Sequence, residues 1–143
     1  MEHSKLLDPD DRARNRDERE AAIAAMISLP QFPCVGAKSA LARDNLKVIA
    51  GHSLDSNWDD LEIHRELLDW AREYRDSTGG LRSLAVIFDG PLNLSEAEFE
   101  NLLWARIQSL ADKDAWLGQD YDSRVSSDPG DPHFSLSFGG EAF

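Results

Sequence analysis

The chain has 143 residues, a formal net charge of −12, 41% hydrophobic residues and 29% charged residues. Its length suits one domain with a real core, and its composition lies outside the range of disordered proteins. The acidic balance, without clustered Lys or Arg, excludes nucleic acid as a partner because phosphate binding requires clustered cations.

The sequence also bears on the cellular compartment. No segment approaches the roughly 20 apolar residues of a membrane span, and residues 1–19 lack the apolar run of a signal peptide. Cys34 is the single cysteine, so an intramolecular disulfide cannot form. We therefore expect a cytoplasmic protein without a membrane partner.

The N-terminal half predicts two helices and a strand. Residues 1–16 carry mixed charges without an apolar period and are expected to be a flexible lead-in, with residues 17–143 forming a single domain. Carboxylates at the start and apolar residues at helical spacing predict a helix from Asp17 to the proline at position 30. A short helix is expected after Pro33, then a strand over residues 46–50 and a polar turn over residues 51–57.

The middle of the chain predicts a longer helix and a buried strand. Helical spacing indicates a helix over residues 59–76 whose apolar stripe holds Ile63, Leu67, Trp70 and Tyr74, with His64 on its polar side. Gly79 and Gly80 suit its C-terminal cap. Residues 83–88 form a nearly continuous apolar run, typical of a strand covered on both faces.

The C-terminal third begins with a capping box formed by Ser95 and Glu98. The predicted buried stripe of the helix that follows is Phe99, Leu102, Leu103, Ile107 and Leu110. Residues 112–132 are expected to be a long acidic loop and residues 134–138 a strand that ends without a turn. The predicted fold class is therefore α/β or α+β, a small mixed sheet flanked by helices whose last strand is truncated.

Cys34 is the most informative candidate for chemistry. It follows Pro33 and opens a predicted helix, whose dipole would stabilise a thiolate that could act as nucleophile, redox centre or metal ligand. The alternative is an inert cysteine buried by packing.

Other familiar sites are not supported. Residues 36–39 (Gly-Ala-Lys-Ser) look like half a phosphate-binding loop, but the two required glycine positions hold Phe32 and Ala37, which leaves Lys38 as a helix-surface residue. The four histidines do not have the spacing of a zinc site, and His133 is expected to be an exposed turn residue. The carboxylates provide no evident acid–base pair, because most are assigned to polar helix faces or to the acidic loop.

Three segments, in this order and spacing, resemble the YqcI/YcgG family: residues 32–45 (FPCVGAKSALARDN), residues 88–104, which contain Phe-Asp-Gly-Pro and Ser-Glu-x-Glu-Phe-Glu, and residues 131–143 (DPHFSLSFGGEAF). The resemblance covers the chain from about Ala22 to its last residue. It implies a haem-dependent oxygenase that hydroxylates a guanidine nitrogen of arginine or a related amino acid, so that a small cationic amino acid is the expected substrate. Within the family's Phe-Pro-Cys-Val-Gly motif, the resemblance implies a role for Cys34 as axial ligand of the haem iron.

Family members continue past the point that corresponds to Phe143, so the resemblance is to an N-terminal portion. This leaves two further hypotheses. One is a non-catalytic fragment that self-associates, or pairs with a missing C-terminal part, through its exposed terminal strand. The other is a thiol redox protein that uses Cys34 with an external thiol, since the chain has no second cysteine.

Overall fold

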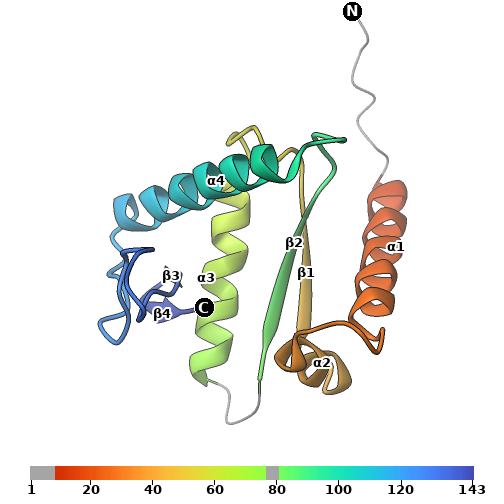
Figure 1. The fold of residues 1–143 in the computed structure, drawn as a ribbon, viewed down its shortest axis with the longest axis horizontal. Helices are drawn as coiled ribbons and strands as arrows, with labels where there is room; N and C mark the ends of the chain where they lie inside the picture. Colours follow the sequence, from red (N-terminus) through yellow and green to blue (C-terminus); the bar gives the residue numbers. More distant parts are fainter. Residues whose placement is uncertain (1–8, 77–80) are drawn as a thin grey trace, which may run out of the picture. The chain divides into compact units, whose positions relative to one another are not determined.

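The computed structural model describes the backbone of residues 9–76 and 81–143 and, within these ranges, the side chains from residue 17 onward (Figure 1). The described part contains four helices and two small sheets of two strands each, which confirms a small mixed α+β fold. No helix in these ranges combines the length and the apolar character needed to cross a membrane.

The chain divides into two compact units. Among the described residues, the first unit comprises 9–50 and 81–87, and the second comprises 51–76 and 88–143. Each unit is therefore described by itself.

The first unit contains two helices and most of one sheet. Helix α1 (Pro9–Ile27) begins eight residues before the predicted start at Asp17, and residues 1–8 of the predicted lead-in lie outside the described residues. Helix α2 (Val35–Ala42) follows the two prolines as predicted. Ile27, Ala40 and Ile49 form the buried apolar core of this unit.

The sheet of the first unit pairs β1 (Leu46–Gly51) with β2 (Ser83–Phe88). The amide of Ser83 donates to the carbonyl of Asn45 at one end, and that of Asp89 donates to the carbonyl of His52 at the other, so the strands run parallel. Strand β2 has its predicted bounds, but all six residues are half-buried. The expected burial of β2 on both faces is therefore only partial among the described residues.

The second unit is built on helices α3 (Asp60–Asp76) and α4 (Glu96–Trp116), which pack against each other. Its buried apolar residues are Leu54, Ile63, Leu67, Trp70, Ala71, Leu110 and Phe138. The predicted stripe of α3 is therefore confirmed except at Tyr74, which is exposed because the last turn of the helix, from Arg72 onward, leaves the core.

Helix α4 starts at the predicted capping box and then departs from the prediction. The Ser95 hydroxyl accepts from the Glu98 amide at 3.1 Å and donates to the Glu98 carboxylate at 3.0 Å. Of the predicted apolar stripe, Leu110 is buried, Leu102, Leu103 and Ile107 are half-buried, and Phe99 is exposed. The buried face of the helix also holds Arg106 and Asp114, which were not predicted there. The helix also runs to Trp116, so the predicted loop loses its first five residues, 112–116.

The end of the chain forms a hairpin. Strand β3 (Ser137–Phe138) pairs antiparallel with β4 (Glu141–Ala142), and the two glycines between them have φ angles of 63° and 79°. Consecutive positive φ angles match the right-handed twist of paired strands, which explains the Gly-Gly sequence. The predicted strand over residues 134–138 that ends without a turn is therefore wrong, because residues after Phe138 fold back onto it.

Gly139 provides a test of this packing. A Cβ atom there would lie 2.8 Å from Leu68 Cδ2, at a φ of +63°. We expect Gly139→Ala to lower the free energy of unfolding by about 2 kcal/mol or more, since the left-handed conformation costs about 1–2 kcal/mol and overpacking adds about 1–3 kcal/mol. Urea denaturation measures the change.

Gly118→Ala is the matched control, because Gly118 also has a positive φ but nothing lies within 4 Å of a Cβ there. It should show the conformational cost of about 1–2 kcal/mol alone. An equal loss in both variants would contradict the close packing of Gly139 on Leu68.

Candidate functional site

Cys34 lies at the N-terminal end of α2 in the first unit. It is the N-cap residue, with φ of −91° and ψ of 102°, and its Sγ accepts a hydrogen bond from the Ala37 amide at 3.4 Å. The thiol is exposed. The interpretation of Cys34 as a residue buried by packing is therefore wrong, whereas its predicted position at the start of a helix is confirmed.

The surface beside Cys34 is open and apolar. A Cβ atom on Gly36 would lie 3.9 Å from the Cys34 Sγ and 4.0 Å from Leu81 Cδ1, so Gly36 lies within contact distance of both side chains. Val35 and Leu81 are both exposed. An apolar group could thus reach the exposed sulfur beside the side chains of Val35 and Leu81.

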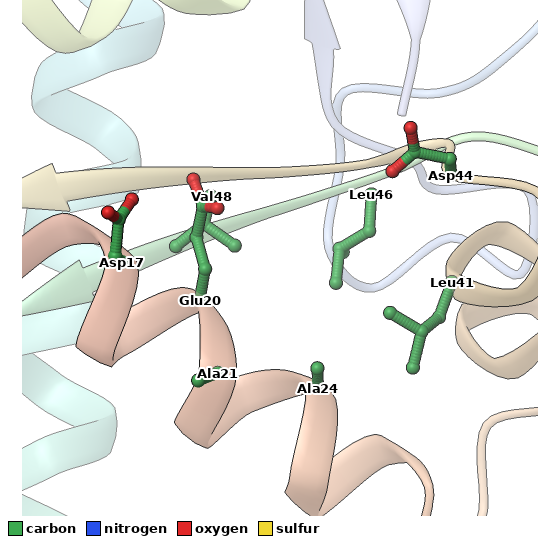
Figure 2. Close-up of a pocket in the computed structure, with 8 residues that line it drawn as sticks. All are labelled: Asp17, Glu20, Ala21, Ala24, Leu41, Asp44, Leu46 and Val48. Carbon is green, nitrogen blue, oxygen red and sulfur yellow. The ribbon is translucent and has the colours of Figure 1, made fainter.

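A pocket of about 400 Å³, here called the acidic groove, lies elsewhere in the first unit. Three of its residues are carboxylates and five are apolar; its lining is Asp17, Glu20, Ala21, Ala24, Leu41, Asp44, Leu46 and Val48. Figure 2 shows the groove between α1 and β1. Cys34 does not line it. Leu41, near the C-terminal end of α2, lines the groove, whereas Cys34 caps the N-terminal end of the same helix. The eight residues of α2, at 1.5 Å each, therefore place the two sites about 12 Å apart along the helix.

A buried ion cluster lies between α3 and α4 in the second unit. Arg106 is 3% exposed, and its guanidinium donates to the carboxylates of Asp59 and Asp60. It also donates to the carbonyls of Ser53 and Ser56. Because a buried charge is costly unless it is paired, these contacts are needed to keep Arg106 in the core.

The cluster extends beyond Arg106 on both sides. Asp60 accepts from Lys113 Nζ at 2.7 Å and from the Ser109 hydroxyl. The Arg106 guanidinium lies 5.2 Å from the centre of the Phe88 ring, within the range of a cation–π contact. A Cβ atom on Gly51 would lie 2.5 Å from that ring, so the glycine permits this position of Phe88.

His64 forms a second buried polar contact. Its Nε2 lies 2.7 Å from Asp114 Oδ1, which also accepts from the Gly139 amide at 3.1 Å. The prediction of His64 on the polar side of its helix is wrong, because pairing with Asp114 allows the imidazole to be only 1% exposed. Among the carboxylates assigned to solvent, Asp59 and Asp60 of the α3 region and Asp114 and Asp122 of the predicted acidic loop are likewise buried.

These buried polar contacts are structural in character. The four carboxylates named above all accept hydrogen bonds from protein groups, which directs their charge inward rather than toward a ligand. His133 is exposed as predicted, and its ring Nδ1 lies 3.3 Å from Asp131 Oδ1. Among the described side chains, no group of three or more His, Cys, Asp or Glu could hold a metal ion. The described surface therefore has two candidate sites, Cys34 and the acidic groove.

Lys38 anchors the start of α2 rather than a phosphate. Its Nζ donates to the carbonyl of Leu29 at 2.9 Å, and the side chain is half-buried. This contact fixes α2 against the segment that follows α1.

Comparisons with known proteins give one match. The model of the YqcI/YcgG family matches residues 23–143. No curated protein and no solved structure matches the chain.

Removing the buried cation should be costly. We expect Arg106→Met to lower the free energy of unfolding by about 3–5 kcal/mol, because it leaves Asp59 and Asp60 buried with one cation fewer. Arg65→Met is the control, since Arg65 is an exposed arginine of α3 in the same unit. It should cost about 0.5 kcal/mol or less. Equal losses in urea denaturation would contradict the structural role of the cluster.

The Asp60 carboxyl should make stability depend on pH. Burial raises its pKa, but hydrogen bonds from Lys113 and Ser109 and the positive charges of Arg106 and Lys113 outweigh burial and hold it below the usual 3.8. The unfolded chain therefore binds this proton more readily, and the stabilisation is present above the unfolded pKa and lost as the pH falls through the folded pKa.

Asp60→Asn measures this effect. The difference in unfolding free energy between the wild-type chain and the variant should narrow as the pH falls from about 5 to about 3, because the unfolded chain takes up a proton on Asp60 before the folded chain does. Denaturation across this range tests it, and a difference that stays constant would contradict the lowered pKa of Asp60.

Proposed function

Because the chain belongs to the YqcI/YcgG family over residues 23–143, we propose that it forms part of a haem-dependent oxygenase that hydroxylates a guanidine nitrogen of arginine or a related amino acid. The observation that carries the proposal is the exposed thiol of Cys34 at the N-terminus of α2. The activity is the one implied by the family resemblance, and Cys34 is the proposed axial ligand of the iron.

The position of Cys34 suits a thiolate ligand. The amides at the N-terminus of a helix and its dipole lower the free energy of a thiolate relative to the thiol. The Ala37 amide already donates to Sγ, and hydrogen bonds of this kind tune a metal-bound sulfur. The exposed side of the sulfur is left for the iron.

The surroundings also suit the macrocycle. Gly36 places no side chain beside the sulfur, and the exposed side chains of Val35 and Leu81 offer apolar contact to a planar group. Haem bound there would supply oxygen activation, and a thiolate ligand favours cleavage of the O–O bond. In this proposal α2 orients the sulfur, and the acidic surface, with a net charge of −12, attracts the cationic substrate.

The alternative of pairing through the terminal strand has less support. The outward amide of Ala142 on β4 donates to Asp122 Oδ2 at 2.8 Å, so this edge group is already satisfied. The Ser135 hydroxyl donates to the carbonyl of Phe143 at 2.6 Å. The Ala142 contact occupies a position that an added strand would need, and the Ser135 contact ties the last residue to the segment before β3.

The haem proposal is tested by the absorption spectrum of the reconstituted chain. We expect wild-type protein to bind haem with a Soret band, and Cys34→Ser to shift or remove that band. Serine removes the thiolate but retains an N-cap acceptor, whereas Cys34→Ala removes both, so α2 should remain formed in the serine variant and lose about 1 kcal/mol of capping in the alanine variant. Circular dichroism provides the folding control.

Two results would contradict this proposal in different ways. An unchanged Soret band in Cys34→Ser would exclude Cys34 as the ligand while retaining haem. Colourless wild-type protein after reconstitution would exclude haem binding by this chain.

A further inference from the structure

The acidic groove has a charge distribution that sets it apart from a general acidic surface. Figure 2 shows Asp17 and Glu20 toward one end and Asp44 toward the other, with Leu46 between them. Asp44 lies in the turn just before β1, with Leu46 and Val48 following on the strand, and Asp17 and Glu20 lie one turn apart on α1. The groove therefore has negative charge at both ends.

None of these three carboxylates forms an ion pair with another described residue, although several cations of the chain do so elsewhere. Asp17 and Glu20 share a helix face at a spacing where like charges repel. A cation placed in the groove would relieve this repulsion.

The middle of the groove is apolar. Ala21 and Ala24 on α1 face Leu41, Leu46 and Val48 from α2 and β1, and the small alanines keep the groove open. The volume of about 400 Å³ falls at the lower end of the range for small-molecule sites, which favours a small free ligand over a peptide segment. A ligand that matches this surface has an aliphatic middle and positive ends.

We propose that the acidic groove binds a small linear alkane with an ammonium group at each end. One ammonium group pairs with Asp17 and Glu20, the other pairs with Asp44, and the methylene chain contacts Leu46 and Val48. This site lies at the opposite end of α2 from Cys34, so the inference does not rest on haem binding.

The test uses the haem-free chain and three probes of the same length in calorimetric titrations: 1,5-diaminopentane, 1-aminopentane and 1-pentanol. The diamine should bind at least about tenfold more tightly than the monoamine, because a second charged hydrogen bond contributes about 1.5 kcal/mol or more. Pentanol should bind most weakly. Added salt should weaken the binding of the diamine more than that of the alcohol.

Variants then assign the two ends. Asp44→Asn should reduce the affinity for the diamine about tenfold, to that of the monoamine, while retaining the shape of the groove. Glu20→Gln should weaken both amines. Glu18→Gln is the matched control, because Glu18 is an exposed carboxylate of the same helix that does not line the groove, and it should leave both affinities unchanged.

Several results would overturn the inference: no binding of the diamine by folded protein, equal affinities for the diamine and the monoamine, or equal effects of Asp44→Asn and Glu18→Gln. A lysine-containing peptide that binds more tightly than the diamine would overturn the assignment to a free small molecule. All of these readouts are independent of haem, so they separate this inference from the proposed function.

Discussion

The positive charge of Arg106 is buried between two helices, and the arrangement of the second unit depends on how that charge is compensated. Its guanidinium reaches Asp59 and Asp60 at the start of α3 and the carbonyls of Ser53 and Ser56 in the preceding turn. One side chain of α4 therefore fixes both the beginning of α3 and the chain that leads into it. A hydrophobic residue could fill the same volume, but it would leave two carboxylates and two carbonyls without this donor.

A second set of hydrogen bonds connects α3 and α4 to the hairpin at the end of the chain. Asp114, two turns after Arg106 on α4, binds His64 of α3 and the amide of Gly139 in the hairpin. The carbonyl of Gly139 accepts from Arg75 at 3.0 Å, so both polar groups of this glycine are bound to helix side chains. Asp122 similarly accepts from the amide of Ala142 and from Arg124. The short hairpin is thus held by side chains outside its two strands, which a two-stranded ribbon in water requires.

The elements that could be predicted from the sequence are those with a simple apolar pattern. Strand β2 and the buried stripe of α3 follow directly from the spacing of their apolar residues. The buried face of α4 could not be predicted in the same way. Arg106, Leu110 and Asp114 lie on it at spacings of four, and charged residues are normally assigned to solvent. Only their partners on and just before α3, some 50 positions away, make their burial possible. The one available indication was that these three residues share a helix face.

The two candidate sites also differ in how far they could be predicted from the local sequence. The position of Cys34 at a helix start follows from the local sequence, whereas its exposure depends on how α2 packs. The acidic groove combines side chains from three separate segments, so local spacing could not predict it. The Gly-Gly pair before Glu141 was a usable signal for a hairpin, but the apolar alternation of residues 134–138 favoured a longer strand instead.

The exposed thiol of Cys34 has a practical consequence for spectroscopy. All four tryptophans, at positions 58, 70, 104 and 116, belong to the second unit, whereas the single cysteine belongs to the first. A maleimide dye attached to Cys34 would accept excitation energy from those indoles without any engineered residue. The native chain therefore allows the separation of its two units to be followed by fluorescence.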